Sequence, residues 1–299
     1  MTRAAKWIVA GAVAAAVLLA AALWIWQSAR PATAEATALS YLRALESGDV
    51  AAIADLSPAV PDDSLTALDG ADQRIADVAV TSVDESGDRA TAAISFGLAD
   101  ASQTATLSLS RSDTRWVVDA SSLGTASTTT TIGSFVAVGG VTFPTDEAIS
   151  LLPAMYTASA APADLLDGAA TIEVLPGEAS DVALEPTLRS AATTAAQEAL
   201  DEHLAECTRP SARPPDGCGI RIPWGTEFTV VSDVEYRIDT APTMTLDAEE
   251  FTTSAGVLVA TVMGTGRDGS SRTTTYRTDA WMLRGDVAFT DTNIALTFW

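Results

Sequence analysis

The stretch that decides the fold is Tyr41–Leu56, which reads YLRALESGDVAAIADL. Its first half carries apolar residues at helical spacing, and Gly48 can take the left-handed conformation that ends a helix. Asp49 then suits the N-cap of a second helix, because its carboxylate can accept hydrogen bonds from free backbone N–H groups. The stretch therefore predicts two short helices with a shared apolar side that needs a sheet to cover it.

Four segments of alternating polar and apolar residues follow and would supply that sheet. A turn over Asp84–Arg89 (DESGDR) separates the first segment from the second. The predicted strands are 78–83, 90–96, 104–110 and 116–119. The Tyr41–Leu56 segment, a kinked helical hairpin or a single bent helix, followed by a meander of four strands predicts an α+β layer over residues 31–122.

The segments YLRALESGDVAAIADL, VTSVDESGDRATAAISF and LSLSRSDTRWVVD resemble the small NTF2-like (cystatin-like) domains found outside actinobacterial membranes. The resemblance covers about Thr33 to Ser121. It implies a helix-plus-curved-sheet cone with an internal pocket, and an apolar pocket of this kind would be lined by Tyr41, Leu45, Phe96 and Trp116. Enzymes of the family commonly use Asp/His pairs. No histidine lies in this segment, so the resemblance does not imply catalysis here.

An uncharged run of 20 residues, WIVAGAVAAAVLLAAALWIW, covers Trp7–Trp26. As a helix it would be about 30 Å long, enough to cross a bilayer, and its terminal tryptophans match the aromatic belts at the two interfaces. Arg3 and Lys6 precede it. The positive-inside rule then predicts a cytoplasmic tip and transmembrane signal anchor in residues 1–30, contacting lipid through residues 7–26, and an extracytoplasmic chain over 31–299.

The alternative to an anchor is a cleaved signal peptide, since Ala32–Ala34 fits the small-residue cleavage pattern. However, the apolar run is longer than the usual signal core of about 7–15 residues. The run also ends in the bulky Trp24 and Trp26, several residues before that pattern. An uncleaved, single-pass signal anchor in the cell membrane is therefore the favoured interpretation.

Composition excludes several function classes. The formal net charge is -22, and the chain after Arg30 carries 14 basic against 39 acidic residues, a net of -25. Such a surface repels nucleic acid. Lys6 is the only lysine and His203 the only histidine, so lysine-based catalysis outside the anchor is excluded. One histidine and two cysteines do not form a recognisable zinc set. No catalytic, cofactor-binding or metal residue is assigned, and an enzyme is not expected.

The middle of the chain, residues 123–185, predicts a small β-sandwich that is similar in pattern to Ig-like modules. Its short predicted strands are 135–138, 141–143, 156–160 and 170–174, with a turn signal at Gly139–Gly140. Thr125–Thr131 (TASTTTT) is read as a polar linker. The alternative is an edge strand, because threonine favours strands.

Residues 186–299 predict a helix that starts at Pro186, reaches Cys207 and precedes a long antiparallel meander. Cys207 and Cys218 enclose a proline-rich loop and are expected to form a disulfide, worth about 2–3 kcal/mol. His203 is expected to be a surface or half-buried helical residue. This part is therefore expected to be a disulfide-stapled α+β domain with an antiparallel sheet.

The carboxylate doublets Asp62–Asp63 and Glu249–Glu250 are read as solvated turns. Adjacent strand residues face opposite sides, so neither doublet makes a facing acid–base pair. The function expected is a non-catalytic interaction or structural module of the cell envelope, whose partner is an envelope protein or a wall component. The alternative is a module that binds a small apolar ligand in the NTF2-like pocket, without a cofactor.

Overall fold

The computed structural model describes residues 33–210, 216–221 and 226–299. They form two compact units: residues 33–60 with 75–123, and residues 61–74 with 124–299. The predicted anchor, residues 7–26, lies outside the described residues. Within the described part, no helix is both long and apolar enough to cross a membrane.

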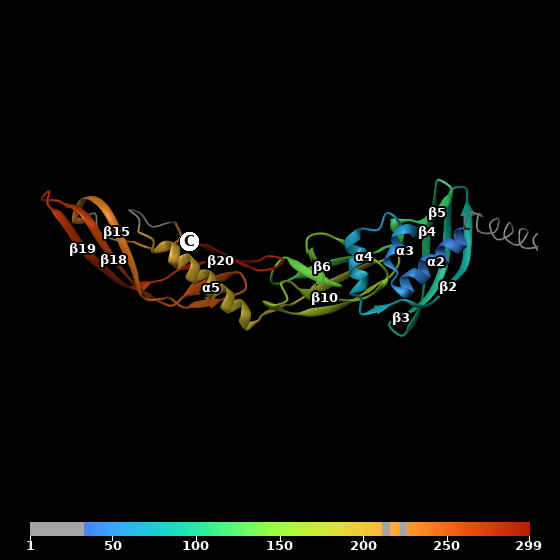
Figure 1. The fold of residues 1–299 in the computed structure, drawn as a ribbon. Coiled ribbons are helices and arrows are strands. Elements are labelled where there is room, and N and C mark those ends of the chain that lie inside the picture. Colours follow the sequence, from blue (N-terminus) through green and yellow to red (C-terminus); the bar gives the residue numbers. More distant parts are fainter. Residues whose placement is uncertain (1–32, 211–215, 222–225) are drawn as a thin grey trace, which may run out of the picture. The chain divides into compact units, whose positions relative to one another are not determined.

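The expectation of an α+β chain is wrong, because strands hold 52% of the described residues and helices only 20%. The described chain is mostly β (Figure 1). It contains four α-helices, and only α2 (Ala34–Ser47) and α5 (Ser190–Cys207) exceed eight residues. The segments between them pair as strands with partners far along the chain, and this tertiary pairing overrides the helix preference of their many alanines. The longest strand, β15 (Phe228–Thr240), has 13 residues.

The predicted pair of helices is confirmed in the first unit as α2 and α3 (Val50–Leu56). Gly48 ends α2 with φ +73°, and its N–H bonds to the carbonyl groups at the end of that helix. Asp49 caps α3, where its Oδ1 accepts a 3.0 Å hydrogen bond from the Ala52 amide. Local side-chain and backbone contacts therefore set both the end of α2 and the start of α3.

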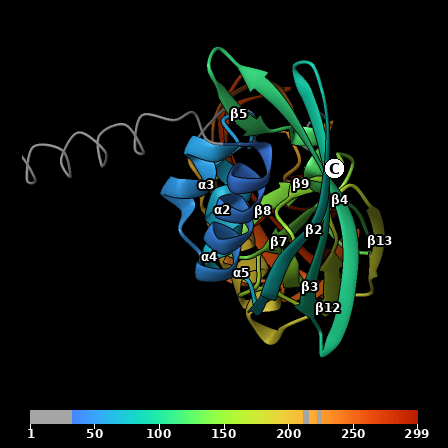
Figure 2. The same ribbon diagram turned by 90° about the vertical axis from the view of Figure 1, so that its right-hand side faces the viewer.

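The predicted four-strand meander of the first unit is also confirmed. Neighbouring strands pair in the order β2–β3–β4–β5, all antiparallel. Figure 2 shows α2 and α3 on one face of this sheet. Apolar side chains alternate into that face, and the strand bounds are β2 (Ala76–Ser86), β3 (Arg89–Leu98), β4 (Ala101–Ser112) and β5 (Arg115–Val118).

The second unit begins with a helix that the sequence reading missed. Asp62 and Asp63, read as a solvated turn, form the first turn of α4 (Asp62–Asp69). Carboxylates are favourable there because they face the positive end of the helix dipole. The Ser64 hydroxyl donates a 2.7 Å hydrogen bond to the Ser150 carbonyl, which ties α4 to β9 (Ile149–Leu151).

Residues 125–131, read as a linker, lie almost entirely in a strand. β6 (Gly124–Thr130) stands between β13 (Ala179–Leu184) and β9, so it is not an edge strand either. Its pairing with β13 is parallel. A second sheet pairs β1 with β10, β10 with both β7 and β12, and β7 with β8; the bounds are β1 (Gln73–Arg74), β7 (Phe135–Val138), β8 (Val141–Pro144), β10 (Ala154–Ala160) and β12 (Ala169–Val174).

The rest of the second unit places α5 against antiparallel strands. Pro186 does not start this helix: it precedes β14 (Thr187–Leu188), which pairs with β11 (Leu166–Asp167). One sheet has the order β15–β18–β19, with β18 (Gly256–Gly266) and β19 (Ser271–Trp281). The other has the order β16–β17–β20–β21, with β16 (Met244–Leu246), β17 (Glu250–Thr253), β20 (Arg284–Phe289) and β21 (Ile294–Phe298).

Candidate functional site

The candidate site is a hollow of about 440 Å³ beside the β15–β18–β19 sheet, which we call the arginine hollow. Pockets that bind small ligands commonly start at about 300 Å³. Ten residues line the hollow; they include two arginines and no acid, although acids outnumber basic residues 39 to 17 in the chain. The lining residues are Gly219, Ile220, Arg221, Leu258, Ala260, Tyr276, Arg277, Thr278, Ala280 and Trp281.

The floor of the hollow is apolar and rigidly built. Leu258 and Ala260 lie two residues apart on β18, so both point to the same side of the sheet, and each is 3% exposed. Ala260 pairs with Tyr276, and Leu258 pairs with Thr278, so β19 continues the same face. The central strand β18 therefore supplies the floor of the hollow, and the edge strand β19 supplies one of its sides.

The opposite wall is the segment that follows the disulfide. Cys207 and Cys218 are bonded, as the sequence predicted, and both are buried. The indole Nε1–H of Trp281 donates a 2.8 Å hydrogen bond to the Cys218 carbonyl. Gly219 has φ +60°, and a Cβ there would lie 3.1 Å from the Met282 carbonyl oxygen, which only glycine avoids. These contacts position Arg221 at the hollow.

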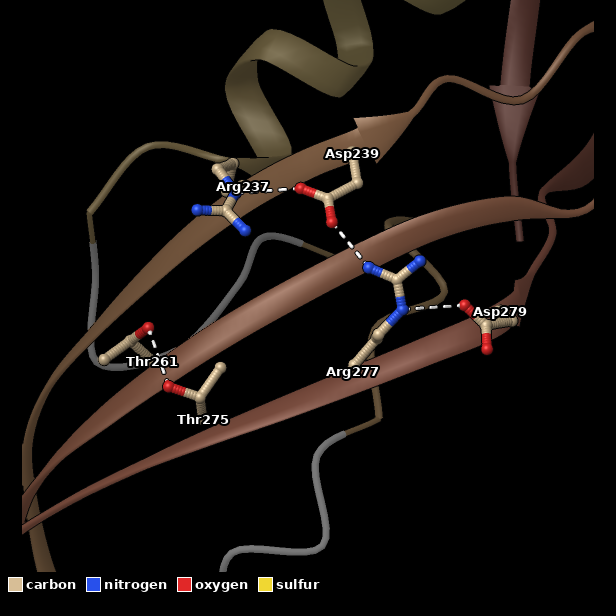
Figure 3. Close-up of polar contacts among 6 residues, drawn as sticks. All are labelled: Arg237, Asp239, Thr261, Thr275, Arg277 and Asp279. Carbon is tan, nitrogen blue, oxygen red and sulfur yellow. Dashed lines mark hydrogen bonds and ion pairs between the residues drawn. The ribbon is translucent and has the colours of Figure 1, made fainter.

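An ion-pair ladder crosses the same three strands (Figure 3). By strand alternation its side chains leave the sheet on the face opposite to that of Leu258 and Ala260. Arg237 and Arg277 face each other across Val259 of β18, because both pair with that residue in the register. Asp239 accepts hydrogen bonds from both guanidinium groups, at 2.8 Å from Arg237 Nε. Asp279 accepts from Arg277 Nε at 3.0 Å. Arg277 is thus held by two carboxylates, while the described residues supply no ion-pair partner for Arg221.

Three titratable groups of the ladder and hollow have a shifted pKa: Asp239, Tyr276 and Arg277. The hydrogen bond from Arg237, together with Arg277, lowers the pKa of Asp239, and the hydrogen bond to Asp239 raises the pKa of Arg277. Burial, with a smaller contribution from Glu227, raises the pKa of the Tyr276 hydroxyl. Each shift moves the group further from neutrality, which does not suit a general acid or base.

The Asp239 carboxyl is expected to titrate below the ordinary aspartate pKa. Its depressed folded-state pKa means that the ladder's contribution is present above the unfolded-state pKa and is lost as the pH falls through the folded-state value. Carboxyl-detected NMR on the full chain would measure the midpoint, which Arg237→Gln should raise. A midpoint that does not move in this variant would contradict the assigned cause.

The four side chains expected to line a pocket in the first unit are all buried there. Tyr41, Leu45, Phe96 and Trp116 are between 0 and 4% exposed. They come from α2, β3 and β5, so the structure brings them into the core of one unit. The Tyr41 hydroxyl has no hydrogen-bond partner among the described residues. Burial also raises the pKa of this hydroxyl.

Tyr41→Phe is expected to raise the free energy of unfolding by about 1 kcal/mol, because it removes a buried and unpaired hydroxyl. Tyr156→Phe is the matched control, since the Tyr156 hydroxyl is buried but donates to the Leu152 carbonyl at 2.8 Å. The control should lower the same quantity by about 1–2 kcal/mol. Urea unfolding of the full chain measures both. Destabilisation by Tyr41→Phe would show that a bound molecule or water partners this hydroxyl.

The sequence reading assigned no residue of the arginine hollow. The one available signal was charge: Arg267, Arg272 and Arg277 cluster in the β18–β19 hairpin of an acidic chain. The other wall could not be found from the sequence, because Cys218 and Trp281 lie 63 residues apart. No protein-family model matches this chain, and no curated protein or solved structure matches it either. The resemblance to NTF2-like domains therefore stays a prediction.

Proposed function

We propose that this protein is a non-catalytic binding module of the cell envelope, anchored by residues 7–26, whose residues 31–299 act outside the membrane. The arginine hollow would receive an anionic group, such as a carboxylate, on an envelope protein or wall component. The observation that carries this proposal is Arg221: it lines a hollow without acidic lining residues and has no ion-pair partner among the described residues. An anion would otherwise be repelled by a chain of net charge -22.

Arg221 would make the main contact. Its guanidinium presents donors in a planar fork that matches a carboxylate. Arg277 already bonds to Asp239 and Asp279, which offset its charge and occupy its donors, so it offers no free fork. The buried floor of Leu258 and Ala260 would receive the apolar part next to the anion. Ligand sites in proteins are usually built in this way: an apolar surface buries most of the ligand, and a few polar groups fix its orientation.

Non-catalytic binding is favoured over catalysis by the pKa directions at the site. The shifts of Asp239, Tyr276 and Arg277 all stabilise the charge state that each group already has at neutral pH. A catalytic acid or base is usually tuned towards neutrality instead.

A photo-reactive amino acid at Thr278 tests the proposal in the full-length protein in its native membrane. Thr278 lines the hollow and is exposed. Thr292, exposed in the β20–β21 turn, is the control position. We expect one dominant adduct, identified by mass spectrometry, at position 278 and not at 292. No adduct, or the same adducts at both positions, would contradict a binding role for the hollow.

A second candidate is the binding of a small molecule in the first unit beside α2. The observation that favours it is the buried, unpaired Tyr41 hydroxyl, because buried hydroxyls in proteins usually have a partner. Native mass spectrometry of the full-length protein tests this candidate: a bound small molecule that is lost in Tyr41→Phe and kept in Tyr156→Phe would support it, and its absence from the wild type would contradict it.

A further inference from the structure

Three side chains with metal-ligating atoms converge at the end of α5, apart from the arginine hollow. The ligand atoms of His203, Cys207 and Cys218 all lie within 4.8 Å of one another, with the two sulfurs joined in the disulfide. His203 and Cys207 are four residues apart and therefore share one face of the helix. The sequence did not reveal this set, because Cys218 follows the helix and reaches it only through the fold.

Each of the three positions is held by contacts that do not depend on the S–S bond. The His203 ring stacks on Phe298, with 3.8 Å between ring centroids and an interplanar angle of 8°. Its Nε2 lies 3.3 Å from the Gly217 carbonyl oxygen. The Cys218 backbone is fixed by the hydrogen bond from Trp281, and Cys207 is fully buried on α5.

We propose that, in the dithiol state, His203, Cys207 and Cys218 bind a thiolate-preferring divalent metal of the Zn²⁺ class. The spacing of these residues in the sequence matches no zinc motif, but the fold brings them together. Two thiolates and one imidazole are then a three-ligand set known from zinc sites, with the fourth position left for water or another ligand. A backbone carbonyl that accepts the second N–H of a metal-bound histidine is the usual outer partner, and the Gly217 carbonyl stands in that place. The negative end of the α5 dipole also favours a cation beside Cys207, the last residue of the helix.

The chemistry links two states of the same residues. The dithiol exists before oxidation of the folded chain, and it returns when a dithiol reductant transfers two electrons and two protons to the S–S bond and becomes a disulfide itself. Zn²⁺ binding then releases the two thiol protons. In the reverse exchange a disulfide reagent accepts two electrons and leaves as two thiolates, which re-forms the Cys207–Cys218 bond, removes both thiolate ligands and excludes the metal. When the disulfide is absent, a bound metal would thus link Cys218 to the end of α5 in its place.

The test uses the full-length protein, reduced with a dithiol without oxygen, freed of reductant and titrated with Co²⁺. We expect thiolate-to-cobalt charge-transfer absorption in the reduced protein, its removal by Zn²⁺, and no such absorption in the oxidised protein. His203→Phe keeps a ring against Phe298 but removes the nitrogen ligand, and should weaken the affinity about tenfold or more. Glu202→Ala, an exposed neighbour on α5, is the control and should bind like the wild type.

Two results would overturn the proposal. One is a reduced wild type without charge-transfer absorption, or with the same cobalt affinity as His203→Phe. The other is a reduced chain that loses its far-UV circular dichroism and does not regain it with Zn²⁺, since the site requires the fold. Neither result depends on ligand binding in the arginine hollow, so this proposal and the proposed function can fail separately.

Discussion

Replacing Trp281 with alanine is expected to lower the free energy of unfolding by about 3–5 kcal/mol, the usual cost of deleting a buried tryptophan side chain. Trp281 is 2% exposed and belongs to the core that includes Leu258 and Leu283. Its indole N–H also bonds the Cys218 carbonyl at 2.8 Å. Loss of the ring therefore leaves both a cavity and an unpaired carbonyl. Urea unfolding of the full chain measures the effect.

Two further variants separate the parts of this effect. Trp281→Phe keeps much of the apolar area but loses the N–H donor, so an intermediate cost of about 1–3 kcal/mol is expected. Trp299→Ala is the control, because Trp299 is 55% exposed and contacts the Arg284 guanidinium over its ring. Surface changes of this kind usually cost less than about 1 kcal/mol. Equal effects of Trp281→Ala and Trp299→Ala would contradict the structural role of Trp281.

The second large effect is expected from removing the disulfide. Cys207→Ala combined with Cys218→Ala should lower the free energy of unfolding by about 2–4 kcal/mol, because the bond closes a loop between residues 11 apart. The same variant should weaken the Thr278 adduct, since Gly219, Ile220 and Arg221 follow Cys218 directly and form a wall of the hollow.

The control for the disulfide is the pair of single variants. Each single variant breaks the same bond, so each should cost nearly as much as the double variant, measured by urea unfolding without reductant. A double variant as stable as the wild type would show that the fold itself, and not the disulfide, holds the loop. An unchanged Thr278 adduct would show that the wall forms without it.

Three of the four helices in the described residues, and the first sheet, could be predicted because their determinants are local. The hydrogen bonds of Gly48 and Asp49 that end α2 and start α3 reach no more than four residues along the chain. The alternation of apolar and polar residues in β3 and β4 is likewise visible in the sequence. The α4 helix was missed because its acidic start was read as a solvated turn. Its signals were present: Pro61 precedes it, acids occupy the first turn, and Leu65 and Leu68 lie three apart.

Non-local features could not be predicted. Threonines in β6 look like a polar linker, and only pairing with β13, about 55 residues later, makes them a strand between two neighbours. The arginine hollow likewise joins residues near 220 to residues near 280. Overall β content was underestimated for the same reason, because strands depend on partners that the sequence does not display.

The most direct test of the central claim is the charge dependence of the adduct at Thr278 in the full-length protein. Arg221→Glu reverses the charge that would meet the anionic group, whereas Arg115→Glu changes an exposed arginine of the first unit paired with Asp55. The account predicts that Arg221→Glu abolishes the adduct and that Arg115→Glu leaves it in place. An adduct that survives Arg221→Glu at the wild-type yield would contradict the account.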